Sequence, residues 1–494
     1  MTIARRLGER GDGMAAVRHI AAAAQAGFPE AMTRLGQCYL RGQGVPRCAP
    51  EARHWLERAA EAGDVTALTE LAGLALCGIS GPYQRGPFAA DDAVAPDHEH
   101  AASLARRAME AGSAEAGALL AYVLTLDPSI AAYEREADIL YEEAANMGSP
   151  LGQLGHAVAL LRDHAAEPAE KLLTAAAEAG LPTARFLLGA LAEAGLTGIA
   201  DLPASVAHYR IAAEQGHSGA KTRLGLALLL GRGVDRDPLG GETWLRRAAM
   251  DGDVLAAASL GDLHSTGNQT EAARWYRRAA EQGHGGAAHA LARVLAAGAE
   301  GPADPMDIAN MLRKAIECGE SSAWPALGRL IASSSLPDHA GPGMGGWLRC
   351  MIAEGHAEAE FYAGLFVTVT KGGESGDAES GDAVARRHYL LAAAHGMPEA
   401  MAASAEMLLN GRGGAADPEL ARAMFEFAAA RDHAGASYAL GVIAGPGAMG
   451  EAHIRRAAAL GHEKALGHEK ARTIAVMASV DWTSGPSRAE RPPP

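Results

Sequence analysis

One phrase recurs along the whole sequence at a nearly constant spacing. It reads Trp-Tyr-x-x-Ala-Ala-x-x-Gly-x-x-x-Ala-x-x-x-Leu, and its fullest copy spans residues 275–291. Its central glycine, which we call the anchor, stands at Gly27, Gly63, Gly112, Gly148, Gly180, Gly216, Gly252, Gly283, Gly319, Gly355, Gly396 and Gly461, with Asp432 in the same place between the last two. Seven of the twelve intervals between successive anchors are 36 residues, so the chain is an array of repeats and must be interpreted as one.

Both halves of the phrase have the spacing of an amphipathic helix. In the copy that ends at Gly63, Trp55, Ala59 and the neighbouring alanines fall on one helical face. The anchor glycine suits the end of this helix, because glycine adopts a positive φ without a Cβ clash. A second helix, which carries Ala31 and Leu35 at a spacing of four, follows each anchor. We call the helix after an anchor helix A and the helix before the next anchor helix B.

A Leu-Gly pair stands in the middle of many A helices. It occurs at Leu35-Gly36, Leu188-Gly189, Leu224-Gly225, Leu260-Gly261, Leu327-Gly328 and Leu440-Gly441. Glycine inside a helix costs about 0.5–1 kcal/mol relative to alanine. Its recurrence therefore predicts a compensating close approach between helices, which a residue without a side chain permits.

These units resemble Sel1-like repeats, which are longer relatives of the tetratricopeptide helix-turn-helix. The resemblance rests on Ala31-x-x-x-Leu35-Gly36, the Gly42-x-Gly44-Val45 turn, Trp55 and Ala59-Ala60-x-x-Gly63, and it covers roughly residues 16–472. It implies an all-α fold, a right-handed α-solenoid of about twelve repeats, and a role in binding other proteins. The family has no shared catalytic residues, so the resemblance implies none here. Gly152 stands where the repeat has alanine, which leaves the helix A register of the fourth repeat open.

The solenoid is expected to occupy most of the chain. We predict a polar lead-in over residues 1–15, one solenoid over 16–480, and a Pro-rich disordered tail over 481–494. Two intervals longer than 36 residues predict loop insertions within 77–100 and 371–382, both rich in glycine and acidic residues.

No motif in the sequence indicates catalysis or a bound metal. Nucleophile elbows, phosphate-binding glycine loops, dinucleotide fingerprints and zinc spacings are all missing from it. The run Asp97-His98-Glu99-His100 carries metal-ligand types, but adjacent residues on a loop rarely form a site, and we expect a solvated loop. We therefore predict a non-enzymatic protein with no cofactor, no metal and no small-molecule substrate.

Charge and cysteine content narrow the partners and the compartment. A formal net charge of −15 argues against a nucleic-acid partner, because such a partner needs phosphate neutralisation. The five cysteines show no Cys-x-x-Cys spacing and no fixed place in the repeat, which favours a reducing compartment. No signal sequence and no apolar run long enough to insert in a membrane is evident. We expect a cytoplasmic, bacterial protein.

The repeat also predicts where a partner binds. Helix A directs the residues 4, 8 and 12 after the anchor to the core, so those 3, 7, 10 and 14 after it should face the concave surface. In the first repeat these residues are polar, whereas later repeats place apolar residues there: Leu119, Tyr122, Leu187, Leu226 and Leu255. Apolar side chains on a wet face mark an interaction site. The alternative is that they pack against neighbouring helices of a tight superhelix.

We therefore expect a scaffold or adaptor that binds one or more proteins, through peptides or helices, on its concave face. The alternative is a regulatory or accessory subunit of a bacterial enzyme complex, for example in polysaccharide synthesis or signalling. Stable association with a single enzyme at fixed stoichiometry would distinguish the second function from the first.

Overall fold

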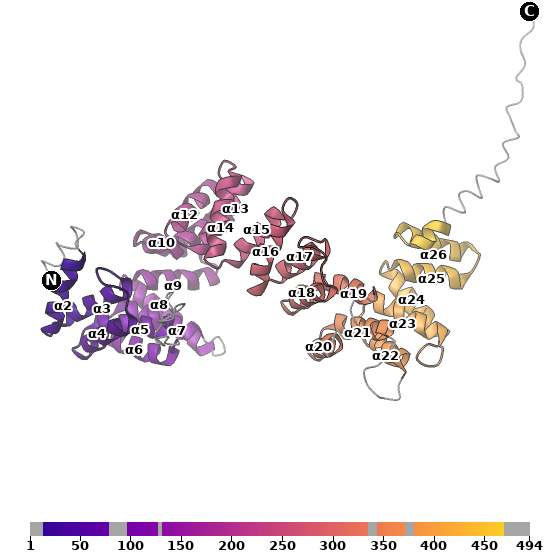
Figure 1. Ribbon diagram of the computed structural model, residues 1–494, viewed down its shortest axis with the longest axis horizontal. Helices are drawn as coiled ribbons and strands as arrows, with labels where there is room; N and C mark the ends of the chain where they lie inside the picture. Colours follow the sequence, from indigo (N-terminus) through magenta and orange to yellow (C-terminus); the bar gives the residue numbers. More distant parts are fainter. Residues whose placement is uncertain (1–12, 79–95, 127–130, 334–342, 371–379, 469–494) are drawn as a thin grey trace, which may run out of the picture. The chain divides into compact units, whose positions relative to one another are not determined.

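The computed structural model describes residues 13–78, 96–126, 131–333, 343–370 and 380–468. In these ranges the regular elements are helices, apart from one isolated bridge pair between Ala299 and Gly301. The chain divides into two compact units, Met1–Ala256 and Ala257–Pro494, each built from helices that follow one another in chain order (Figure 1).

The helices are short and of similar length. The first unit contains α2 (Gly13–Gln25), α3 (Pro29–Arg41), α4 (Ala49–Glu61), α5 (Val65–Cys77), α6 (His98–Glu110), α7 (Ala114–Thr125), α8 (Ala131–Asn146), α9 (Pro150–Arg162), α10 (Ala166–Glu178), α11 (Pro182–Ala194), α12 (Leu202–Glu214), α13 (Ser218–Leu230) and α14 (Pro238–Met250). Helix α15 (Val254–His264) begins just before the division between the units. The second unit continues with α16 (Gln269–Glu281), α17 (Gly285–Ala296), α18 (Pro305–Glu317), the 3-10 helix η1 (Ser321–Ala323), α19 (Trp324–Ala332), α20 (Gly343–Ala353), α21 (Ala357–Thr370), α22 (Gly381–Ala394), α23 (Pro398–Asn410), α24 (Pro418–Ala430), α25 (Ala434–Ala444) and α26 (Ala448–Ala459).

Neighbouring helices in the sequence are neighbours in space. In the first unit α3 packs against α4 and α11 against α12, and in the second α21 packs against α22 and α25 against α26. Helix α7 also contacts α5 and α9, so successive A helices lie next to each other. The predicted all-α solenoid of helix-turn-helix repeats is confirmed.

The anchor and the alanine four residues after it do what the repeat predicts. The anchor glycines have φ between 83° and 100°, and Asp432 takes the same place with a φ of 62°, which aspartate tolerates better than most residues. The alanines are at most 1% exposed; they are Ala31, Ala67, Ala116, Ala184, Ala220, Ala256, Ala287, Ala323, Ala359, Ala400, Ala436 and Ala465. The methyl group of this alanine is thus buried where helix A begins to pack.

The mid-helix glycines lie against a large side chain of helix B. A Cβ on Gly36 would fall 2.7 Å from Cγ of Leu56, and one on Gly189 would fall 2.7 Å from the ring of Tyr209. Both distances are well inside van der Waals contact, so alanine would force the helices apart. The predicted close approach of helices at these glycines is confirmed.

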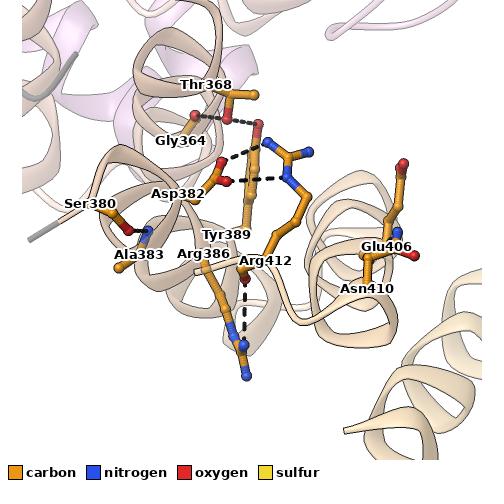
Figure 2. A network of polar contacts seen from close by, with 10 residues as sticks. All are labelled: Gly364, Thr368, Ser380, Asp382, Ala383, Arg386, Tyr389, Glu406, Asn410 and Arg412. Carbon is orange, nitrogen blue, oxygen red and sulfur yellow. Dashed lines mark hydrogen bonds and ion pairs between the residues drawn. The ribbon is translucent and has the colours of Figure 1, made fainter. Parts of the chain in front are cut away.

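The turn between helices A and B packs on the preceding repeat. After α23, Gly413 has a φ of 72°, and a side chain there would clash with the carbonyl oxygen of Asp382 at the start of α22. The guanidinium of Arg412 donates to both carboxylate oxygens of Asp382, over 2.6 and 3.3 Å (Figure 2). Figure 2 also shows Arg386 of α22 directed at the same turn, where it donates to the carbonyl of Arg412. The turn therefore joins consecutive repeats.

Four predicted boundaries need adjustment. Cys77 is the last residue of α5, and α22 begins at Gly381, inside the predicted 371–382 insertion. Helix α6 already begins at His98, with Asp97 as its N-cap, so the end of the predicted 77–100 loop is helical instead. Helix α2 begins at Gly13, inside the predicted lead-in. Residues 79–95 and 371–379 of the insertions, 1–12 of the lead-in and the tail over 481–494 lie outside the described residues.

Candidate partner-binding groove

An open cavity of about 620 Å³ lies within the first unit and is lined by helices α5, α7, α8, α9 and α11. Four of these five are A helices of successive repeats, and α8 is the B helix that follows α7. We call this cavity the groove. Much of its wall is apolar and comes from Leu76, Leu119, Tyr122, Leu151, Leu154 and Val158.

Helix α9 supplies much of the wall, and the repeat explains how. The hydroxyl of Ser149 accepts a hydrogen bond from the backbone N–H of Gly152, over 3.3 Å, and so caps the helix start. From the anchor Gly148, Leu151 and Val158 stand three and ten residues on, which are positions that the repeat directs away from the core. Both side chains therefore point into the groove while the helix keeps its core contacts.

The side wall formed by α8 rests on a glycine of α9. A Cβ at Gly155 would clash with the ring of Tyr141, so this ring lies directly on the α9 backbone. Burial raises the pKa of Tyr141 to about 12. The phenol is therefore neutral at physiological pH and adds aromatic surface without charge.

Large apolar side chains remain exposed at the groove. Tyr122 is 48% exposed, Leu151 37% and Val158 49%. Single exposed apolar residues are common on protein surfaces, but a group of them around one cavity marks a site that a ligand or partner covers.

A small charged cluster lies on one wall. Glu134 and Asp138 are four residues apart on α8 and so share a face of that helix. The Arg162 guanidinium, at the end of α9, lies 2.5 Å from the Asp138 carboxylate and 3.9 Å from that of Glu134. Apart from the tyrosines, these three are the ionisable side chains of the groove lining.

The five residues predicted to bind partners are distributed over several places. Leu119 and Tyr122 both line the groove. Leu187 packs against the core formed by α9, α10 and α11, and Leu226 lines a separate cavity of about 80 Å³. Leu255 is 61% exposed at the start of α15. Partner binding by these residues stays a prediction, and we centre it on Leu119 and Tyr122.

Sequence reasoning missed Leu151, Val158 and the charged cluster. The sequence signal for Leu151 and Val158 was available, because both stand at predicted concave positions of the fourth repeat. Gly152, in the usual alanine place, left that register open. The structure explains Gly152: a Cβ there would lie 2.6 Å from that of Ala144, so the helices approach more closely here and the register is unchanged.

The structure gives no support for a metal site in the part of the chain that it describes. Within the described ranges, no three His, Cys, Asp or Glu side chains gather closely enough to hold an ion. Asp97 accepts from the backbone N–H of His100 over 2.9 Å, which is an ordinary helix cap. Among the described helices, none has the length and apolar character required to span a bilayer.

The family comparison agrees with the repeat geometry. The model of the Sel1 repeat matches residues 29–64, 182–217, 218–253, 254–284 and 398–433. Each matched segment joins the A and B helices of one repeat, for example α11 with α12 and α23 with α24. The helix pairs between these segments have the same construction.

Related proteins include both sequences and solved structures. An uncharacterized protein of Neisseria meningitidis serogroup B is 29% identical over 248 residues, which are 50% of this chain and 49% of that protein. The match thus spans about half the length of this relative. A protective antigen of uropathogenic Escherichia coli with an SLR fold is 22% identical at a TM-score of 0.44, covering 96% of this chain and 99% of the other. A Sel1 repeat protein from Oxalobacter formigenes is 25% identical at a TM-score of 0.42, covering 63% and 90%. Five segments of the chain are thus Sel1 repeats, and the helix pairs between them share the helix-turn-helix architecture.

Proposed function

We propose that the chain is a non-enzymatic scaffold or adaptor that binds a peptide segment or helix of a partner protein in the groove of the first unit. The observation that carries this proposal is the exposure of Tyr122, Leu151 and Val158 around one cavity. Fully burying an apolar side chain of this size contributes about 1.5–3 kcal/mol, so a partner that covers these residues gains substantial affinity.

The cavity dimensions suit a protein segment. A volume of about 620 Å³ lies within the range of ligand pockets, and the cavity is partly open to solvent instead of enclosed. An amphipathic helix or an extended peptide places a row of apolar side chains in such a groove.

Site-specific photocrosslinking tests the proposal. A photoreactive amino acid is placed at Val158 or, as a control, at Ile199, which is 96% exposed in the first unit and does not line the groove. We expect a partner to crosslink from position 158 and not from position 199. Equal crosslinking from both positions, or from neither, would contradict the proposal.

The stoichiometry of the crosslinked complex then separates the two functional classes. Several different partners that all crosslink at the groove indicate a scaffold or hub. One enzyme at fixed stoichiometry indicates an accessory subunit.

A further inference from the structure

We propose that the groove selects partner segments in which a lysine or arginine lies within one helical turn of a large apolar side chain. This inference rests on the proposed function and adds the chemistry of the partner. It follows from the charges in the groove lining, where two carboxylates, Glu134 and Asp138, face one guanidinium, that of Arg162.

The two carboxylates are not equally neutralised. Arg162 lies at hydrogen-bonding distance from Asp138, which engages one guanidinium edge. Glu134 lies 3.9 Å from the same guanidinium, beyond hydrogen-bonding distance, and its side chain is 60% exposed. One negative charge of the groove is thus left over, and it is accessible to an incoming cation.

The rest of the groove does not offset this charge. The remaining lining residues are apolar, glycine, threonine or the tyrosines, and the phenol of Tyr141 stays neutral. The chain as a whole carries a formal net charge of −15, which attracts basic segments over a longer range. An acidic segment would meet Glu134 and Asp138 with no unengaged cation in the groove lining.

The apolar and charged surfaces are close enough for one short segment to use both. Val158 and Arg162 are four residues apart on α9, and Glu134 of the neighbouring helix α8 lies 3.9 Å from the Arg162 guanidinium on the same wall. A partner residue that packs on Val158 therefore brings a cation one helical turn away to Glu134. Long basic side chains also cover apolar surface with their methylene stems, which suits this wall.

A display library of random short peptides, selected against the whole chain, tests the inference. The same selection is made with Glu134→Lys, with Glu142→Lys and with Val158→Glu. Glu142 is a matched control, because it is an exposed residue of α8 that does not line the groove. We expect peptides from the wild type to pair a Lys or Arg with a Phe, Leu, Tyr or Trp within four positions.

The affinity of one enriched peptide, measured by fluorescence anisotropy, completes the test. Glu134→Lys should weaken its binding about fivefold to tenfold at low salt, Glu142→Lys should leave it unchanged, and added salt should reduce the difference. Peptides that are lost with Val158→Glu but show no basic preference, or bind Glu134→Lys as the wild type, overturn this inference and leave the groove as a binding site. If no enriched peptide is sensitive to Val158→Glu, the proposed function itself is wrong.

Discussion

The hydroxyl of Tyr209 donates a hydrogen bond of 2.7 Å to the carboxylate of Glu193, and the ring beneath it lies against the backbone of Gly189. Helix A supplies the glycine and the carboxylate, and helix B supplies the tyrosine. The same arrangement joins Tyr276 to Asp262 over 2.7 Å in the second unit. A glycine that looks unfavourable in an isolated helix is therefore the contact point of a repeat.

Substitution of this glycine should destabilise the first unit. Gly189→Ala gains about 0.5–1 kcal/mol of helix propensity, but overpacking against Tyr209 costs about 1–3 kcal/mol, and we expect a net loss of about 1–2 kcal/mol. Gly73→Ala is the control, because Gly73 also lies inside a helix and a Cβ there would meet nothing within 4 Å. The control should stabilise by about 0.5–1 kcal/mol. Urea unfolding followed by circular dichroism measures both, and two shifts of the same sign would count against this account.

The stability of the first unit should fall at acidic pH, because a histidine that caps α13 becomes protonated. Nδ1 of His217 accepts from the backbone N–H of Ala220 over 3.1 Å at the start of α13, which requires a neutral ring. Burial lowers the pKa of His217 below its usual 6.5, in spite of the nearby Asp253 carboxylate. The cap therefore contributes fully above pH 6.5, and its contribution is lost as the pH falls from 6.5 through the lowered pKa.

The substitution His217→Asn isolates this effect, since asparagine caps a helix without titrating. The melting temperature of the wild type should fall more between neutral and mildly acidic pH than that of His217→Asn, which at neutral pH should melt somewhat lower because it loses the stacking of the His217 ring on Phe186. An identical pH dependence would show that the His217 cap does not contribute.

The turn after α23 allows a comparison of backbone and charge effects. Gly413→Ala places a side chain at positive φ and against the carbonyl of Asp382, and we expect a loss of about 2–4 kcal/mol from the second unit. Arg412→Ala removes the half-exposed ion pair with Asp382 and should cost only about 0–1 kcal/mol. Chemical unfolding of both variants measures the two losses of stability. A larger loss for Arg412→Ala would show that the ion pair, and not the backbone of Gly413, dominates this turn.

Much of the fold could be predicted because the same packing contacts recur from repeat to repeat. The alanine four residues after all anchors but Gly148, and the glycine of each Leu-Gly pair, recur at fixed spacing, so their burial and close packing followed from the sequence. The Asp97–His100 segment was assigned to the insertion, although the repeat gave the start of its helix: α4 begins 14 residues before the anchor Gly63, and the same distance before Gly112 gives His98. Its assignment to a loop was wrong because Asp97 caps α6.

The candidate site could be predicted only in part. The repeat rule gave Leu119 and Tyr122, and the same rule applied to the fourth repeat would have added Leu151 and Val158. Glu134 lies on a B helix, for which the rule gave no exposed positions. Its proximity to Arg162 depends on how α8 crosses α9, and sequence spacing does not determine that geometry.

The most direct test of the central claim uses the partner that crosslinking identifies, purified on its own. Calorimetry measures its affinity for Val158→Glu and for Ile199→Glu. Circular dichroism first establishes that both variants keep the wild-type helix content. We predict that Val158→Glu weakens binding about tenfold or more, because a charge replaces apolar surface that the partner covers, and that Ile199→Glu binds as the wild type. Wild-type affinity in the Val158→Glu variant would contradict the account.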